Sequence, residues 1–434
     1  MPEGAGQVGT GVEIEEINRI KDQFVEGQIW EKKQSQNYWQ RRYDGIHRVE
    51  NIFNEPTDDN LSAAFDNFWQ SLQDLSNNPE DTAVRATVKE RANTLVDAFH
   101  SIEEQLTDYK RSLNGDVKTT VDEINSLGTR ISDLNEQIAH IKGTGKNPND
   151  LMDSRDKLIE DLNKKVNVRT RQDDRGYINI SIGGMSFVSG DNVNKLKTEK
   201  VSDAPNEDII KFAELDRKAD IKNGELAGLL DLRGVYNSST GQSEGIIPDY
   251  KNKLDDMANT FANKFNDVHQ NGFDFNGDSG VEFFLSDTDT NGDGTLDGSD
   301  ITADSLIVND TIKNNVKKIA AGSEANVGNG ENAVQLADVI KKEQLNFDDG
   351  QANLMDKYES VISSLGVKGQ RANQMVSNQD TLVEQLENKR QSISGVSLDE
   401  EMANMIKYQQ AYSASAKLIS NANRMLDSLM SILR

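Results

Sequence analysis

The fold is decided by the stretch AVRATVKERANTLVDAFHSIEEQLTDYKRSLNGDVKTTVDEINSLGTRISDLNEQIAHIK, residues 83 to 142. Its apolar residues alternate steps of four and three in two series: Leu95, Phe99, Ile102, Leu106, Tyr109 and Leu113, then Ile124, Leu127, Ile131, Leu134, Ile138 and Ile141. This heptad seam predicts a long helix that buries a narrow stripe against partner helices, either in the same chain or in a neighbouring one. Gly115 lies between the two series and is expected to bend or break the helix.

Helical and strand patterns alternate around this stretch. Leu61, Phe65, Phe68, Trp69 and Leu72 form one amphipathic stripe, between turn clusters at 54–59 (NEPTDD) and 77–81 (NNPED). VNVRT and YINISI alternate with the period of a strand on either side of QDDRG, which predicts an antiparallel hairpin. Helical patterns return at 225–233, 250–269, 312–321, 332–342 and 349–394.

We therefore expect a mainly α protein with inserted β (α+β), elongated and multi-domain. The helical domain should occupy 1–165, 224–272 and 312–394, interrupted by a small antiparallel β-domain at 166–223. Residues 273–311 form an acidic loop region, since no Lys or Arg lies between Lys264 and Lys313. A final helix should occupy 395–434.

Composition excludes several classes of function. The chain has 434 residues, and its 73 Asp and Glu against 48 Lys and Arg give a net charge of −25, which repels nucleic acids and anionic membranes. It has no cysteine, and therefore neither disulfides nor thiolate nucleophiles. No apolar run is long enough to span a membrane, and no cleavable signal peptide is visible at the N-terminus.

Motifs for catalysis are missing from the sequence. The four histidines, His47, His100, His140 and His269, are too far apart to form a zinc-binding pair on a helix, and no G-x-S-x-G elbow occurs. Gly4, Gly6 and Gly9 fit G-x-G-x-x-G without a preceding strand, and HIKGTGKN lacks two residues of a phosphate loop. We therefore predict that the protein is not an enzyme.

One constellation predicts a metal site. DTNGDGTLDGSD, residues 289 to 300, places oxygen ligands at the spacing of a calcium loop: Asp289, Asn291, Asp293, Thr295, Asp297 and Asp300. Gly294 lies where such a loop turns sharply, whereas Asp300 replaces the usual bidentate Glu. The alternative is a metal-free turn rich in Asp and Gly. A shorter set, Asp274, Asn276 and Asp278, is read as a turn.

The C-terminal helix carries the candidate partner-binding residues. Met405, Tyr412, Ile419, Leu426 and Leu433 recur every seven residues, with Tyr408, Ala422 and Leu429 beside them and Ser415 as the polar exception. The opposite face carries Lys, Gln, Asn and Ser. Because a single amphipathic helix buries nothing by itself, this stripe predicts a partner helix.

Several stretches resemble the FlgK family of bacterial flagellar hook-associated proteins. They are GTGVEIEEINRIKDQF (9–24), the NIFNEP…NNPED block within 51–99, LMDSRDKLIEDL (151–162), NGELAGLLDLR (223–233), FNDVHQNGFDFNG (265–277) and the ending 395–433. The ending is similar throughout the axial flagellar proteins, whereas the NIFNEP…NNPED block points to FlgK. In that family a helical segment precedes the Gly-Thr-Gly-Val strand and pairs with the C-terminal helix. Nothing of that kind stands before Met1, so we expect the C-terminal helix to lack its mate, as in a truncated chain.

The resemblance implies a structural protein of the hook–filament junction. It implies that the last helix lies in the axial core, and that the chain forms a ring with other copies of itself. Further implied partners are the hook protein, the second junction protein and an export chaperone that holds the C-terminal helix. The protein would be extracellular and exported without a cleaved signal peptide. Alternatives are flagellin or the second junction protein, and, from another class, a secreted calcium-binding hydrolase or adhesion module.

Overall fold

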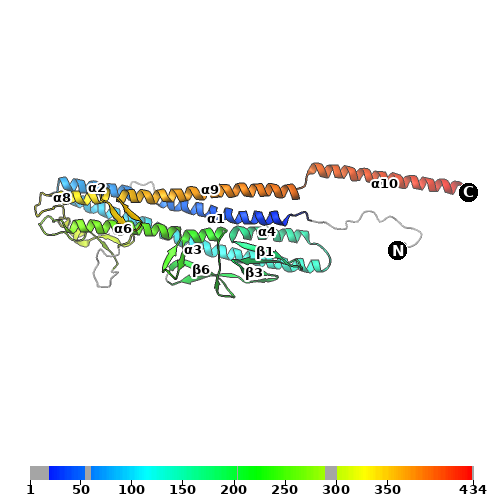
Figure 1. The fold of residues 1–434 in the computed structure, drawn as a ribbon, viewed down its shortest axis with the longest axis horizontal. Coiled ribbons are helices and arrows are strands. Elements are labelled where there is room, and N and C mark those ends of the chain that lie inside the picture. The colour runs from blue at the N-terminus through cyan, green and yellow to red at the C-terminus, as the bar shows by residue number, and fades with distance from the viewer. Residues whose placement is uncertain (1–18, 54–59, 203, 289–300, 433–434) are drawn as a thin grey trace. The chain divides into compact units, whose positions relative to one another are not determined.

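The computed structural model describes residues 19–53, 60–202, 204–288 and 301–432 (Figure 1). Two compact units make up the chain: Trp30–Asp380 forms the larger, and Met1–Ile29 with Thr381–Arg434 the smaller. Two helices, α1 (Gln23–Phe53) and α9 (Leu354–Ser394), run from one unit into the other. The helices that lie wholly in the larger unit are α2 (Leu61–Asn77), α3 (Thr82–Gly143), α4 (Asn149–Lys165), α5 (Glu225–Arg233), α6 (Ile246–Gln270), α7 (Asp310–Asn314) and α8 (Glu331–Lys341).

The heptad seam is confirmed as the buried side of α3. The helix starts at an N-cap, where the Asp81 side chain accepts a hydrogen bond from the Ala83 amide. Leu95, Phe99 and Leu106 are fully buried, as are Leu113, Ile124, Ile131 and Ile138 further along. The expected break at Gly115 is wrong, because α3 continues through it as one helix of 62 residues. Packing on both sides of this position outweighs the weak helix propensity of glycine.

Aromatic side chains fill the core between α2, α3 and α6. Phe65 of α2 makes T-shaped contacts with Phe99 of α3 and Phe261 of α6, at centroid distances of 5.7 and 5.4 Å. Phe68 continues the cluster towards Phe265. The stripe read from residues 61–72 therefore faces the core, except that Trp69 is only partly buried.

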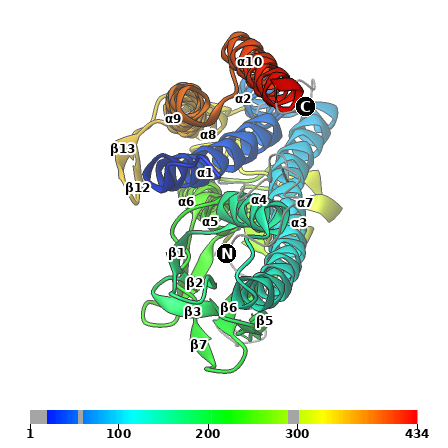
Figure 2. The same ribbon diagram turned by 90° about the vertical axis from the view of Figure 1, so that its right-hand side faces the viewer.

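The strands form small antiparallel sheets that pack on α3. One sheet has the order β1-β2-β3-β4, from β1 (Val168–Gln172), β2 (Ile178–Ile182), β3 (Met185–Ser189) and β4 (Asn192–Val193). The next has the order β5-β6-β7, from β5 (Leu196–Val201), β6 (Ala204–Phe212) and β7 (Arg217–Lys218). The predicted hairpin is the β1–β2 pair, in which Val168 lies opposite Ile182. In Figure 2 these sheets lie in the lower half of the view beside α3, whereas α9 lies in the upper half.

Three asparagines on α3, spaced eleven and ten residues apart, attach the strands to the helix. Asn125 exchanges two hydrogen bonds of 2.8 Å with the backbone of Leu196 in β5. Asn135, which is fully buried, does the same with Ile178 in β2 at 3.0 Å. Asn114 accepts a bond of 3.2 Å from the Asp208 amide in β6. These amides satisfy backbone groups that the small sheets leave unpaired.

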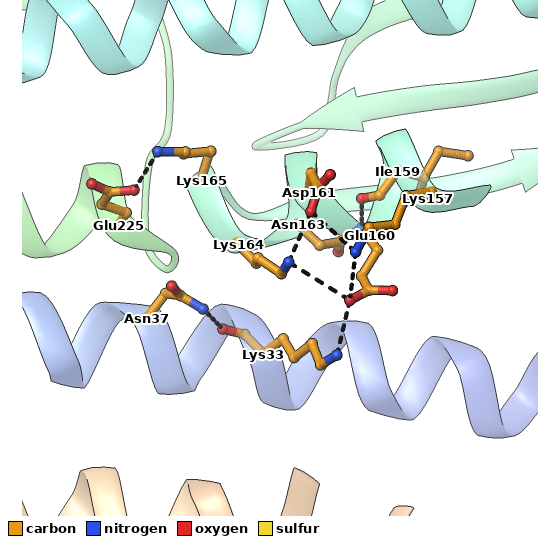
Figure 3. A network of polar contacts seen from close by, with 10 residues as sticks. All are labelled: Lys33, Asn37, Lys157, Ile159, Glu160, Asp161, Asn163, Lys164, Lys165 and Glu225. Carbon is orange, nitrogen blue, oxygen red and sulfur yellow. Dashed lines mark hydrogen bonds and ion pairs between the residues drawn. The ribbon is translucent and has the colours of Figure 1, made fainter. Parts of the chain in front are cut away.

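Buried charges connect α1 to its neighbours. Lys33 of α1 forms an ion pair of 2.8 Å with Glu160 of α4, and both side chains are mostly buried (Figure 3). Burial favours the neutral acid, but the hydrogen bond and the positive charge of Lys33 outweigh this effect and lower the pKa of Glu160.

On α5, burial lowers the pKa of Arg233 to about 10, so this guanidinium remains charged at neutral pH. It donates to the Asp208 and Gly234 carbonyls.

Four short hairpins or turns replace expected loops and helices. Strands β8 (Val235–Asn237) and β9 (Gln242–Glu244) interrupt the helical return at 224–272. Strand β13 (Gly350–Ala352), which pairs with β12 (Leu345–Phe347), occupies the expected start of the helix at 349–394, so that α9 begins at Leu354. The helix expected at 312–321 is reduced to α7 and a single 3-10 turn, Val316–Lys318. In the acidic region, β10 (Phe284–Ser286) pairs with β11 (Leu306–Val308).

Candidate partner-binding surface

The smaller unit presents the candidate site on α10 (Leu398–Ile432). Ser397 caps this helix, because its hydroxyl oxygen lies 3.4 Å from the Glu400 amide and its carbonyl accepts from the Glu401 amide. Asp399, Glu400 and Glu401 occupy the first turn, where the helix dipole favours negative charge. The sequence therefore specifies a strong start for a helix of 35 residues.

The apolar stripe of α10 is exposed. Met405, Tyr412, Ile419 and Leu426 each expose more than half of their surface, and Tyr412 reaches 76%. Leu433, the last residue of the predicted set, lies outside the described residues. Within Leu398–Ile432 every side chain is exposed, and none of these residues belongs to the buried core of the described chain.

The exposed surface is wider than the sequence analysis predicted. Leu418, Met425 and Ile432 form a second row at steps of seven, each one position before a residue of the first stripe, and Ile432 is 81% exposed. Near the start of the helix, Leu398, Met402 and Ile406 are exposed as well. The seven-residue repeat contained the signal for this second row. Large exposed apolar patches mark contact surfaces, because monomeric proteins rarely leave them in water.

The predicted calcium loop, Asp289–Asp300, lies outside the described residues. Its surroundings are described: the segment joins β10 to β11, and the Asp287 amide donates to the Ser305 carbonyl at 2.8 Å just before it. The segment thus connects two strands instead of two helices. Among the residues that the structure describes, no group of three or more His, Cys, Asp or Glu side chains is placed to hold a metal ion.

The shorter set at 274–278 is a turn closed by a lysine. Asp274 accepts hydrogen bonds from the amides of Asn276 and Asp278, at 2.7 and 3.0 Å. The Lys318 ammonium nitrogen lies 2.8 Å from Asp274 and 3.0 Å from Asp278. Burial opposes ionisation of Asp274, but Lys318 and these amides lower its pKa. The Lys318 ammonium group thus supplies the positive charge that balances the carboxylates of Asp274 and Asp278.

Two of the four histidines have structural partners on the backbone. His269 is fully buried between the Val281 carbonyl, 2.5 Å from Nδ1, and the Ala320 amide, which donates to Nε2 at 2.8 Å. His100 places Nε2 2.9 Å from the Leu306 carbonyl. Both rings therefore attach the region of β10 and β11 to long helices.

In the described part of the chain, no helix combines the length and apolar character that crossing a bilayer requires.

Long helices, a laterally packed β-layer and an amphipathic helix that exposes its apolar side are the properties of a structural subunit that packs in an assembly. Two family models match this organisation. "Flagellar hook-associated protein FlgK helical domain" matches residues 46–284, and "Flagellar basal body rod FlgEFG protein C-terminal" matches 387–432. The second match covers nearly all of α10.

Whole-length relatives agree with these matches. Flagellar hook-associated protein 1 of Bacillus subtilis is 30% identical over 98% of this chain and 87% of its own length. The protein of that name from Escherichia coli is 27% identical over 98% of this chain and 90% of its own. A solved structure of the flagellar hook junction protein FlgK from Burkholderia pseudomallei shares the fold, with a TM-score of 0.70 at 16% identity over 85% of this chain and all of that one.

This chain belongs to the FlgK family of flagellar hook-associated proteins. It is therefore a structural component of the bacterial flagellum, an extracellular assembly, at the junction of hook and filament.

Proposed function

We propose that this protein joins hook to filament by packing the apolar stripe of α10 against helices of neighbouring axial subunits. The observation that supports this role is the set of thirteen large apolar side chains that α10 exposes. Burying one such side chain is worth about 1.5–3 kcal/mol, so the exposed helix strongly favours association. Towards its C-terminal end, the two adjacent rows form a face that is broader than the seam of a two-stranded coiled coil. This breadth favours contact with more than one helix.

The partners that fit this surface are other copies in a ring, the hook protein below and the second junction protein above. Before assembly, an export chaperone would cover the same apolar stripe and keep it from aggregating. We further propose export through the flagellar secretion channel without a cleaved signal peptide. The role requires no catalysis, and we propose that the protein has no enzymatic activity. Its net charge of −25 supports neither nucleic-acid binding nor membrane insertion.

A charge on the stripe tests the proposal. Leu426→Asp should abolish filament attachment in cells that lack the native gene copy, because it buries a carboxylate in the helix contact. Ser420→Asp adds the same charge on the polar face of α10 and is the matched control, expected to retain motility. The larger unit should keep its melting temperature in both variants. Normal filaments on Leu426→Asp cells would refute the role of the stripe.

A further inference from the structure

Strand β1 is an outer strand that the fold leaves uncovered. Among the described strands it pairs with β2 alone, along Val168–Gln172, and every residue of β1 after Val168 is exposed. The other outer strands of the two sheets on α3 are short or covered. Strands β4 and β7 have two residues each, and Asn125 of α3 bonds the outer edge of β5 at Leu196. An uncovered strand edge of this length can accept a further strand.

The backbone of β1 presents hydrogen-bonding groups on its outer side. The Asp173 amide donates to the Tyr177 carbonyl across the hairpin at 3.0 Å, and this bond fixes the alternation of the ladder before it. The N–H and C=O groups of Thr170 and Gln172 therefore point away from β2. The Val168 carbonyl belongs to the same outward set, and it accepts a bond of 3.4 Å from a glutamine side chain of α1. In the described part of the chain, nothing bonds the outward groups of Thr170 and Gln172.

Two arginines of β1 are exposed without an acidic partner. Arg169 and Arg171 lie on one face of the strand, about 7 Å apart, because alternate residues of a strand share a face. Lys165, just before the strand, pairs with Glu225 at 2.7 Å and with Glu123 at 2.8 Å. Neither arginine forms an ion pair with a described residue. In a chain of net charge −25, this pair of cations favours a carboxylate from outside the chain.

The open edge and the arginines fit the same ligand. A strand added beside β1 would bond to the outward backbone groups, and its alternate side chains would lie next to Arg169 and Arg171. The guanidinium fork of arginine binds a carboxylate with two parallel bonds, which the ammonium group of lysine cannot do. The matching ligand is therefore an extended segment with Glu or Asp at every second position. Two β1 edges would instead bring like charges together, so this strand is unsuited to pairing with its own copy.

We propose that the outer edge of β1 binds an extended acidic segment of another protein by strand addition. The inference goes beyond the proposed function, which rests on α10, and no residue of α10 takes part in it. Thr170 and Gln172 supply the backbone bonds, and Arg169 and Arg171 select carboxylates. The same two charges keep the edge from pairing with apolar or basic strands.

Hydrogen exchange at single-residue resolution tests the strand addition. The purified full chain is mixed with the acetylated and amidated peptide Ser-Thr-Glu-Val-Glu-Thr-Ser. The peptide should slow exchange of the Thr170 and Gln172 amides at least several-fold, with little change at Arg171, whose amide already faces β2. The same peptide with Lys in place of Glu should give no protection. No binding at millimolar peptide, or binding without protection of these two amides, would overturn the inference.

Matched changes separate the charges from the backbone bonds. Arg169→Gln with Arg171→Gln should weaken the affinity for the peptide at least several-fold. Arg48→Gln with Arg371→Gln removes the same charge from exposed positions on α1 and α9 and should leave the affinity unchanged. N-methylation of the central Val of the peptide removes an N–H that would bond to β1, and should abolish protection without any change to the folded chain. Equal binding by the N-methylated peptide, or by the β1 double variant, would contradict strand addition.

Photo-crosslinking in isolated flagella tests the identity of the occupant. p-Benzoyl-phenylalanine at Gln172 should give an adduct with a different protein, at least several-fold above a probe at Glu104 on α3, and the attached peptide should carry carboxylates at alternate positions. An adduct between two copies of this chain, or no excess over Glu104, would overturn the inference. If the chain is missing from flagella, the proposed function fails, and the peptide experiments on the purified chain still decide the β1 edge.

Discussion

Buried polar side chains hold this fold together through the backbone of distant segments. Asn135 bonds to Ile178, and Arg155 beside it donates to the Gly176 carbonyl at 2.8 Å. The sequence marked neither residue, because a backbone partner leaves no trace in residue type. Within the heptad pattern, Asn114 and Asn135 read as ordinary polar positions of a helix. Such anchors become visible only when the strands are placed against α3.

His269 makes the stability of the larger unit depend on pH. Burial lowers its pKa from the ordinary 6.5 to about 4 in the folded protein. Between these values the unfolded chain binds a proton that the folded one does not, so stability decreases as the pH falls from 6.5 towards 4, by about 3 kcal/mol in total. Urea unfolding at pH 7, 6, 5 and 4 measures this loss. His269→Gln should be less stable at pH 7 and flatter across that window; an equally steep decline would assign the loss to other groups.

At the scale of elements, long periodic segments could be predicted and short ones could not. The helix expected at 225–233 coincides with α5, and the predicted C-terminal helix is α10. The hairpins β8–β9 and β12–β13 have strands of three residues, too short for a periodic pattern. Such short strands depend on packing, as when Phe347 of β12 is buried. Sequence periodicity therefore identified the long helices and missed the short hairpins that connect them.

Two glycines of α3 should respond to alanine in opposite directions. A Cβ at Gly115 would meet nothing within 4 Å, so Gly115→Ala should stabilise the protein by about 0.5–1 kcal/mol through helix propensity. A Cβ at Gly128 would lie 2.5 Å from the buried Phe187 ring, so Gly128→Ala should cost about 1–3 kcal/mol by overpacking. Denaturant midpoints of the two variants check the signs. Equal effects would show that α3 does not approach β3 this closely.

We propose that the acidic segment between β10 and β11 binds calcium through Asp289, Asn291, Asp293, Thr295, Asp297 and Asp300. A divalent ion relieves repulsion among four carboxylates, and an affinity of ~10⁻⁴–10⁻³ M would suffice outside the cell. Calcium should raise the melting temperature by mass action, with magnesium much weaker. Replacing Asp289 and Asp293 together by Ala should abolish this shift while helical content stays unchanged. The absence of heat in calorimetric titration at millimolar calcium would leave a metal-free acidic turn.

At the scale of the whole molecule, the sequence predicted where the candidate surface begins on α10, but not how many apolar residues belong to it. The seven-residue stripe located one row of the apolar residues that α10 exposes, because the pattern of a helix that packs on others is independent of which partner it meets. The second row at Leu418 and Met425 was missed, since one stripe is enough to explain an amphipathic helix.

Salt should strengthen self-association of the whole chain. Copies of net charge −25 repel over a Debye length of about 30 Å at 10 mM salt, but of only about 8 Å at 150 mM. The surface that we expect to make the contact, the α10 stripe, is apolar, so screening removes repulsion without weakening the contact itself. Sedimentation velocity at fixed protein concentration should therefore show several-fold tighter association at 150 mM than at 10 mM NaCl. Leu426→Asp provides the control, and its association should be weaker at both salt concentrations. Association that weakens as salt is added would instead mean that opposite charges make the contact, because screening reduces attraction between ion pairs.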